Sequence, residues 1–508
     1  MASLSANIVA NLIGRAWPSL LGILFVPIYL RFMGVEAYGL VGFSATLQGV
    51  MGLLDLGISS TMTRELARLS VIKESNQKQR DLVRTLETLY WLISLAVGII
   101  IVFLAPLLAQ HWIKSHQLSP EQLTTAIQLM GVAVALQFPF ALYQGGLMGL
   151  QYQVMVNAVL TVIGTLRNGG AVLVLWLVSP SITAFMGWQV IAVLVGSLTL
   201  MAILWRKLPK HEKRAKCDLS ILREHWRYAL TVASNGIIGV ALVQSDKIIL
   251  SYILPLEHFA YYTIASTVAS GIWMMIYPLN NAIFPRLVQI HQKENLADAA
   301  NIIHISSQCL SLLVLPISAI LILYSNEILM IWTHDATVAA NSKYIVILLV
   351  IGTTINGLSS IPATASMAFG WPQLVTKVNL IQAIVAVPAI ALLSYYFQAI
   401  GAAFAWVGLN CTYLFFMAPR FFSKYMKKEM KDWYLKDLAL PCAIAFGSLT
   451  LLSEFMSAID KSVTMILLSY VFVLILTAFN MRHARHKMAG WIRFSQNWSR
   501  SKGKNVSS

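Results

Sequence analysis

Charged side chains are scarce in this sequence. Only 11% of its 508 residues are Asp, Glu, Lys or Arg, whereas soluble domains carry about 25%. Cysteine is scarce as well, and the four cysteines are scattered, with no CxxC pair and no Cys/His cluster. This pattern fits neither a disulfide framework nor a metal site. We expect the chain to be neither a small secreted scaffold nor a soluble globular enzyme.

Catalytic motifs are also missing. The sequence contains no Walker A loop, no HExxH and no GxSxG, which argues against ATP hydrolysis and against the hydrolases that these motifs mark. No loop between the apolar stretches is long enough to hold a catalytic domain. We therefore predict a protein that moves something without bond chemistry, and we expect no cofactor.

Apolar residues dominate instead, at 57% of the chain. About 20 apolar residues in a helix span the ~30 Å hydrocarbon core of a bilayer. The sequence predicts an all-α polytopic membrane protein with fourteen such stretches, at residues 7–31, 38–63, 85–110, 123–149, 154–178, 182–205, 228–252, 259–284, 302–324, 343–368, 373–397, 399–419, 437–456 and 462–480.

The net charge of +16 follows the predicted topology. If the N-terminus is cytoplasmic, 29 of the 37 Lys and Arg residues fall in cytoplasmic segments, and the outer loops carry acids such as Glu36 and Glu257. Short cytoplasmic loops are enriched in Lys and Arg. We therefore predict that both termini are cytoplasmic, and we interpret the basic charge as a topology signal with no nucleic-acid partner.

An internal repeat suggests two halves. The segment MGVEAYGLVGFSATL from Met33 aligns without gaps on LPLEHFAYYTIASTV from Leu254, an offset of 221 residues. Chance similarity between apolar segments is the alternative. Two pseudo-symmetric six-helix bundles are a transporter architecture. We predict an N-lobe at 1–206, a linker at 207–227, a C-lobe at 228–424, two further helices within 425–480 and a basic cytoplasmic tail at 481–508.

The first stretch carries Arg15 well inside its length, followed by Pro18, which we expect to bend the helix. A guanidinium in mid-membrane costs at least about 2.5–3.5 kcal/mol, so it normally faces a protein interior or a watery cavity. We predict that Arg15 helps to bind an anion. The alternatives are that it snorkels to the near interface or pairs with an acid.

A second cation, Arg167, lies about a dozen residues from either end of its stretch. It is predicted either to line the same cavity or to pair with a carboxylate such as Asp55, which lies within the second stretch. Asp55 is a candidate for ion coupling or charge balance.

The seventh stretch contains Asp246 and Lys247, which should project about 100° apart and not face each other. Asp246 is a second candidate for ion coupling. Lys247 and Lys377 are candidate substrate ligands, although Lys247 can snorkel and Lys377 lies only about one turn inside its helix. The excess of intramembrane cations predicts an anionic substrate, with phosphate as the best fit.

Three features lie nearer the predicted membrane edges. Arg64 and Glu65 are either interfacial anchors or an inner gate. Glu87 lies close enough to the inner surface to need no special partner. In the eighth stretch, Pro278 and Pro285 suggest a broken helix.

The run PIYLRFMGVEAYGLVGFSATLQGVMGLLDLGISSTMTREL resembles the first two helices of bacterial polysaccharide (O-antigen, Wzx-type) flippases, with their R-x-x-G-x-E-x-Y-G, D-x-G and terminal R-E. The motif from Gln244 to Asp246-Lys247 is also similar. The resemblance covers essentially the whole chain. It implies the MATE-like fold of the multidrug/oligosaccharidyl-lipid/polysaccharide exporter superfamily, with two additional C-terminal transmembrane helices like those of the lipid II flippase.

The resemblance further implies transport of an undecaprenyl-pyrophosphate-linked oligosaccharide to the periplasmic leaflet of the bacterial inner membrane, by alternating access and coupled to H+ or Na+. By position, it assigns Arg15 and the pair Asp246-Lys247 to the functional site. Expected partners are the polyprenyl-linked glycan, membrane lipids, and glycan polymerase and chain-length proteins. The rival interpretations are a cation/drug-proton antiporter of the same fold and a non-transporting scaffold for glycan assembly.

If Arg15 binds the anion, Arg15→Ala should abolish glycan export while leaving the protein inserted at its normal level. Surface glycan on cells that express the variant, compared with its membrane abundance on an immunoblot, measures both quantities. Normal export by the variant would remove the role assigned to Arg15.

Overall fold

The computed structural model describes residues 17–55, 57–72, 75–455 and 469–475. These residues form helices joined by short connections, with no strand among them. The helix at 17–24 ends at a turn at Phe25, two residues before Pro27. Arg15 lies outside the described residues. All fourteen predicted stretches fall at least partly on described helices, although 462–480 is described only over 469–475.

The helices divide into two compact units. Unit 1 extends to Ile264 and includes Val385–Ala402, and unit 2 comprises Ala265–Ile384 and the chain from Ala403. The division falls inside α10, and the predicted lobe boundaries at 206, 227 and 424 stay predictions. Unit 1 contains α2 (Val26–Met33), α3 (Val35–Met51), the 3-10 turn η1 (Gly52–Asp55), α4 (Ile58–Leu69), α5 (Asn76–Leu107), the π-turn η2 (Leu108–Trp112), α6 (Pro120–Gly149), α7 (Gln153–Leu177), α8 (Ile182–Lys207), α9 (Leu219–Ile253) and most of α10 (Leu256–Ser270).

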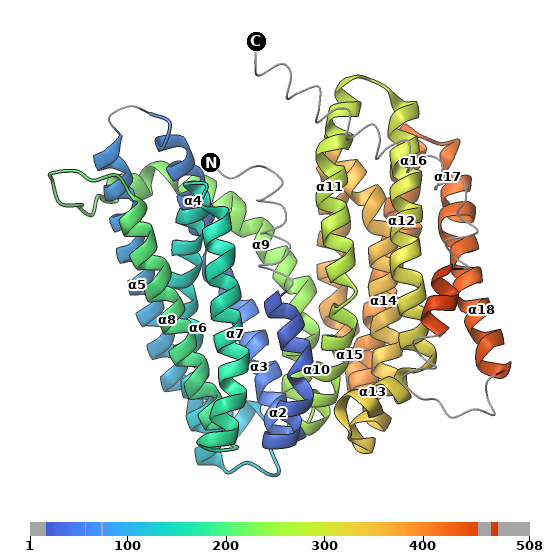
Figure 1. Cartoon of the computed structure of the whole chain (residues 1–508), viewed down its shortest axis with the longest axis horizontal. Coiled ribbons are helices and arrows are strands. Elements are labelled where there is room, and N and C mark those ends of the chain that lie inside the picture. The colour runs from blue at the N-terminus through green and yellow to red at the C-terminus, as the bar shows by residue number, and fades with distance from the viewer. Residues whose placement is uncertain (1–16, 56, 73–74, 456–468, 476–508) are drawn as a thin grey trace. The chain divides into compact units, whose positions relative to one another are not determined.

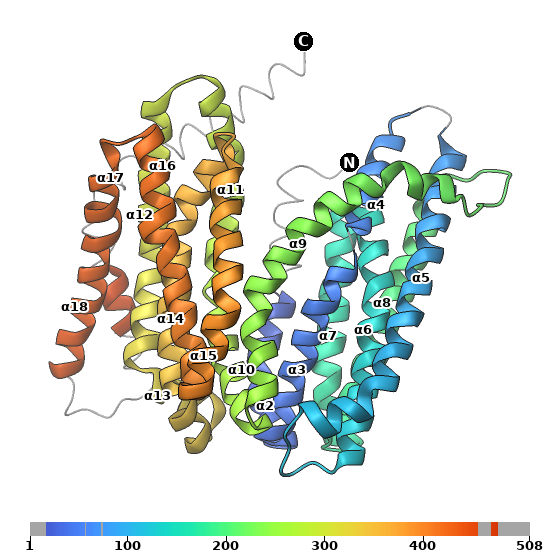
Figure 2. The ribbon, with the colours of Figure 1, turned by 180° about the vertical axis from the view of Figure 1, so that it is seen from behind.

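In unit 1, α5 to α8 run alongside one another (Figures 1 and 2). The helix α6 packs against both α5 and α8, and α7 packs against α8. Unit 2 is arranged around α12, and its elements are α11 (Trp273–Gln292), α12 (Leu296–Leu323), α13 (Ser325–Thr333), α14 (Ala336–Ala368), most of α15 (Pro372–Thr412), η3 (Tyr413–Met417), α16 (Ala418–Tyr425), α17 (Glu429–Asp432), η4 (Trp433–Ala439) and α18 (Leu440–Phe455).

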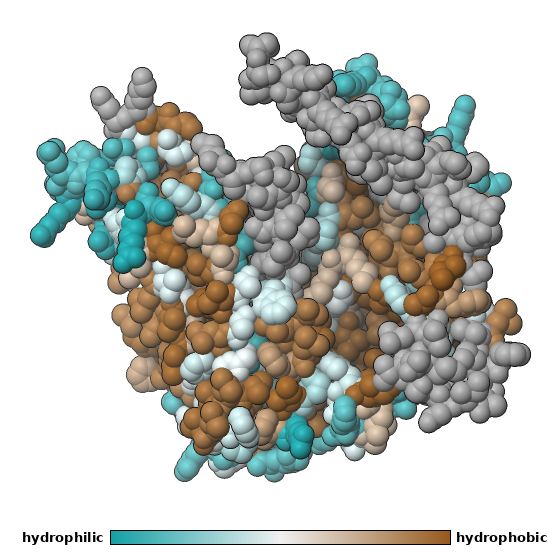
Figure 3. Space-filling model, viewed as in Figure 1, coloured by the Kyte–Doolittle hydropathy of each residue, from teal (hydrophilic) through white to brown (hydrophobic). Residues whose placement is uncertain are grey.

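The surface of α5 shows why this is a membrane fold. One face of the helix, with Tyr90, Val97 and Ile101, is buried, while the opposite face exposes Leu95 and Phe103. A helix that is apolar on both faces needs an apolar solvent. Apolar residues predominate along the middle of unit 1 in Figure 3, and hydrophilic residues gather at the helix ends. Nine described segments are long and apolar enough to cross a bilayer, so the predicted polytopic, all-helical class is confirmed.

The internal repeat has a structural counterpart. The helices α3 and α10 begin at Val35 and Leu256, which are also 221 residues apart. Each is then interrupted: α3 passes through η1 and Gly57, whose φ of 71° favours glycine, and α10 ends before a turn at Gly271–Ile272. The predicted break at Pro278 and Pro285 is wrong, because α11 continues through both prolines.

Two acids are more buried than the sequence suggested. Glu36, predicted in an outer loop, lies in the first turn of α3 with 3% exposure, and its carboxylate accepts the backbone N–H groups of His116 and Gln117 at 2.7 and 3.0 Å. Glu87 is 5% exposed on α5, where it accepts from Tyr143 of α6 at 2.6 Å and Trp205 of α8 at 3.2 Å. Glu87 therefore joins three helices.

Glu87→Ala should lower the free energy of unfolding by about 1–3 kcal/mol, because it leaves the donors of Tyr143 and Trp205 buried without an acceptor. Glu87→Gln keeps an acceptor oxygen and should cost less. The melting temperature in detergent measures both, with the exposed loop variant Glu212→Gln as a control expected to behave as the parent. Equal melting temperatures for Glu87→Ala and Glu212→Gln would contradict this structural role.

Candidate substrate cavity

Unit 1 contains a cavity of about 600 Å³. The helix at 17–24 contributes to its wall together with α2, α3, α6, α7 and α8. Its volume lies within the range of small-molecule sites, about 300–1,000 Å³. The wall is largely apolar, and its polar residues are Ser19, Tyr29, Tyr38, Ser44, Gln48, Gln137, Arg167, Asn168 and Gln189.

Arg167 is the cationic residue in this lining. It lies near the middle of α7, and its Nε donates to the side-chain oxygen of Gln189 on α8. Gln189 is the only hydrogen-bond partner of the Arg167 side chain in the part of the chain that the structure describes. No carboxylate there forms an ion pair with the guanidinium, whose remaining N–H groups are therefore available to an anion.

The neighbours of Arg167 are neutral. The Tyr29 hydroxyl donates to the backbone carbonyl of Asn168 at 2.9 Å, which fixes α2 beside α7. Tyr38, Gln48 and Gln137 line the cavity from α3 and α6. No Asp, Glu, Lys or His belongs to the described lining. The cavity thus combines one cation with hydroxyl and amide groups, a set suited to an anion that carries hydroxyl groups.

Asp55 does not pair with Arg167, so this alternative is wrong. Its carboxylate, at the end of η1, accepts the hydroxyl groups of Tyr90 on α5 and Ser59 on α4, the latter at 2.8 Å. Both carboxylate oxygens of Asp55 therefore accept hydrogen bonds from neighbouring helices, α4 and α5. Asp55 does not line the cavity.

Asp246 and Lys247 lie on α9, also outside the cavity lining. The expectation that they do not face each other is wrong: Lys247 Nζ is 3.9 Å from Asp246 Oδ1 and donates to the carbonyl of Val243 at 3.3 Å. The long lysine side chain curls back along the helix, which overcomes the 100° separation. Asp246 Oδ2 accepts the Tyr262 hydroxyl of α10 at 2.5 Å.

The remaining predicted residues are also outside the cavity. Lys377 is exposed near the start of α15. Glu65 is 2% exposed on α4, and Arg68 donates to its Oε2 at 2.7 Å, while Arg64 is 3.9 Å from Oε1. Of the substrate ligands predicted within the described residues, the cavity therefore contains Arg167 alone. The roles assigned to all of these residues stay predictions.

Sequence reasoning missed Tyr29, Tyr38 and Gln189. Arg167 and Gln189 come from neighbouring helices, and a pairing across helices has no local spacing that would reveal it. A weak signal was present, because Gln189 is an amide within an apolar stretch and such groups require a partner.

Comparison with known proteins adds the family. A model of the family described as polysaccharide biosynthesis proteins matches residues 4–291, more than half of the chain. The chain belongs to this family. A Shigella flexneri protein assigned as an O-antigen transporter is 24% identical over 421 residues, which cover 80% of this chain and 94% of that protein.

Solved structures agree on the fold. The lipid II flippase MurJ in an inward closed conformation gives a TM-score of 0.71 at 12% identity, covering 95% of this chain and 99% of that one. An inward-facing MATE multidrug resistance transporter of the MOP superfamily gives 0.57 at 13% identity, covering 85% and 96%. The predicted family resemblance and MATE-like fold are confirmed, and these named relatives are transporters and flippases, not enzymes.

The field of Arg167 can be measured with a cysteine in the cavity. In a variant with the four native cysteines replaced by serine, Gln48→Cys should react faster with a sulfonate-bearing methanethiosulfonate than with its trimethylammonium analogue. Adding Arg167→Gln should lower that rate ratio by about fivefold, which corresponds to ~1 kcal/mol in total, or ~0.5 kcal/mol for the unit charge of each reagent. An unchanged ratio would show that Arg167 exerts no such field.

Proposed function

We propose that this protein is a flippase that moves an undecaprenyl-pyrophosphate-linked oligosaccharide, such as an O-antigen repeat unit, across the bacterial inner membrane. Both termini are then cytoplasmic, and transport proceeds by alternating access. The observation that carries the proposal is the cavity of unit 1, whose one described cation, Arg167, has only a neutral partner. The family match and the similarity to an O-antigen transporter support the choice of a lipid-linked glycan.

The chemistry of the cavity matches both parts of such a substrate. A guanidinium binds phosphate oxygens through parallel N–H bonds, and the low dielectric of the site strengthens them. Amides and hydroxyls from Gln48, Gln137 and Ser44 can pair with sugar hydroxyls. Arg15 precedes the described helix at 17–24, which also lines the cavity, and it is proposed as a second phosphate ligand.

A drug-proton antiporter of the same fold would need carboxylates facing a cationic drug. The described lining of this cavity has none, and its single charge would repel such a drug. A non-transporting scaffold would not need an arginine with free N–H groups inside a cavity. Both alternatives are therefore less well supported.

Ion coupling is part of the proposal, with H+ or Na+ as the coupling ion. Asp55 and Asp246 are the proposed sites, because each is a carboxylate within the membrane region whose partners include a tyrosine hydroxyl. Loss of the proton or cation would change the charge that each tyrosine hydroxyl faces, and thereby the packing of α5 or α10.

Native mass spectrometry of the purified protein with undecaprenyl pyrophosphate, and in parallel with an organic cation, tests the substrate class. Parent protein should retain the pyrophosphate lipid, and Arg167→Gln should weaken retention about tenfold, since it removes charge-assisted hydrogen bonds. Arg214→Gln, an exposed arginine in the loop after α8, is the matched control and should bind as the parent. Retention of the organic cation alone would favour the antiporter, and equal binding by Arg167→Gln would overturn the role of the cavity.

A further inference from the structure

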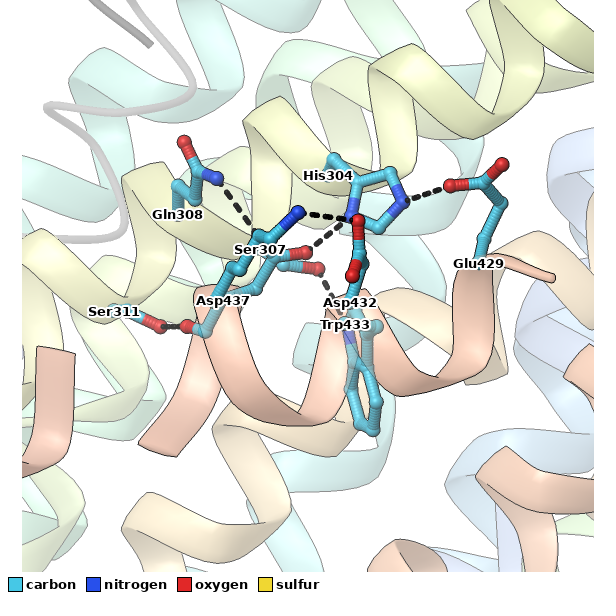
Figure 4. A network of polar contacts seen from close by, with 9 residues as sticks. His304, Ser307, Gln308, Ser311, Glu429, Asp432, Trp433 and Asp437 are labelled. Atoms are coloured by element: carbon cyan, nitrogen blue, oxygen red, sulfur yellow. Dashed lines mark hydrogen bonds and ion pairs between the residues drawn. The ribbon is translucent and has the colours of Figure 1, made fainter. Parts of the chain in front are cut away.

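A polar network lies inside unit 2. It joins residues 304–311 of α12 to α17 and η4, which lead into α18 (Figure 4). His304 is at its centre: Nδ1 is 2.5 Å from Asp437 Oδ2, and Nε2 is 3.1 Å from Glu429 Oε2. The sequence pattern led to no predicted role for His304, Glu429 or Asp437.

Counting hydrogens shows what the network must contain. Each of the two nitrogen-to-oxygen contacts needs one hydrogen, because carboxylate oxygens are acceptors only. A neutral imidazole has one N–H. The arrangement therefore holds one further proton, either on the histidine ring or on one of the two carboxyl groups. Without it, a ring lone pair would face a carboxylate oxygen at hydrogen-bond distance.

The two carboxylates that contact His304 differ in burial and in their number of hydrogen bonds. The Asp437 side chain is 1% exposed, also accepts from Gln308 at 2.8 Å, and its backbone carbonyl accepts from Ser311 at 2.6 Å. In addition, Trp433 donates to Ser307 at 2.9 Å. The side chain of Glu429 is 41% exposed, and His304 is its only hydrogen-bond partner within the described ranges. Removal of the proton should therefore release the Glu429 end first.

The charged and titratable groups around His304 come from α12, α17, η4 and the helices packed against α12. Asp437 and Glu429 act most strongly on His304. Asp432 interacts more weakly with His304 and with Asp437, and it is itself bound to Lys436 at 2.6 Å. Lys431 lies on α17. The other titratable groups on α12 and on the elements packed against it are Asp298, Cys309, Tyr277, Arg286, His291, Glu327, Lys343, Tyr344, Tyr434, Cys442 and Glu454.

We infer that His304, Glu429 and Asp437 form a proton-binding site that fastens α17 to α12. With the proton bound, both ring nitrogens are engaged and α17 is docked. When the proton leaves, the ring keeps its N–H toward the buried Asp437, and the Glu429 contact becomes repulsive. The helix α17 and the linker before it, residues 426–428, then detach from α12 while η4 stays anchored.

Met426 provides a reporter because it is buried, with 7% exposure, in that linker. Met426→Cys is prepared in a chain that keeps the exposed Cys217 as an internal reference and has the other three cysteines replaced. The rate of maleimide labelling at position 426 relative to Cys217 should rise at least about fivefold from pH 6 to pH 8.5, as the opened population grows. No substrate is needed, so the result is independent of the proposed flippase activity.

Glu429→Gln is the decisive companion variant. A glutamine amide can donate to the neutral ring nitrogen, so this contact needs no additional proton and the relative labelling rate should stay within about twofold over the same pH range. Asp298→Asn is the control. Asp298 lies on α12, as His304 does, but outside the network, so this variant should keep the pH response of the parent. A flat rate in the parent, or an equal rise in Glu429→Gln, would overturn the inference.

Discussion

A carboxylate buried among apolar helices must take its hydrogen bonds from the protein, because hydrocarbon offers none. In unit 1, three membrane-embedded acids each accept a hydrogen bond from a tyrosine hydroxyl. Asp55 accepts from Tyr90, Glu87 from Tyr143, and Asp246 from Tyr262. Each of these contacts joins two helices that pack by apolar side chains elsewhere, so the acids fix the register of the helices against one another.

Arg167 differs from these acids because it faces a cavity. Its described partner is the neutral Gln189, and it faces a cavity where the acids of the unit do not reach. The acids of the unit take their partners elsewhere: tyrosine hydroxyls bind Asp55, Glu87 and Asp246, and nearby cations also lie beside Glu87 (Arg84 at 2.9 Å) and Asp246 (Lys247 at 3.9 Å). Because these carboxylates are engaged outside the cavity, the positive charge of Arg167 is left available for an anion.

Much of the fold could be predicted from sequence, because an apolar stretch in a bilayer has to form a helix to satisfy its own backbone. The turn at Gln398, with φ of 52°, lies between the predicted stretches 373–397 and 399–419. What could not be predicted depends on contacts between helices. The burial of Glu87 and the reach of Lys247 to Asp246 are set by neighbours and side-chain flexibility, which linear spacing does not contain.

Some missed features did have a signal. His304, Ser307, Gln308 and Ser311 follow the i, i+3, i+4, i+7 spacing of one helix face, and Glu429, Trp433 and Asp437 follow i, i+4, i+8. The polar face on the otherwise apolar α12 indicates a polar partner, although residues 427–437 are charged at so many positions that the sequence does not mark which of them it is. The cavity offered less, since its polar residues are spread over six helical segments.

The order of the acid–tyrosine pairs along the chain bears on how the protein is made. In each pair the acid comes first, by 35 residues for Asp55 and Tyr90, 56 for Glu87 and Tyr143, and 16 for Asp246 and Tyr262. During synthesis each acidic helix therefore leaves the ribosome before its hydroxyl partner. A single helix would enter the bilayer with its carboxyl group unsatisfied, whereas a hairpin carries acid and tyrosine in together. The sequence order thus favours insertion of these helices as groups, not one at a time.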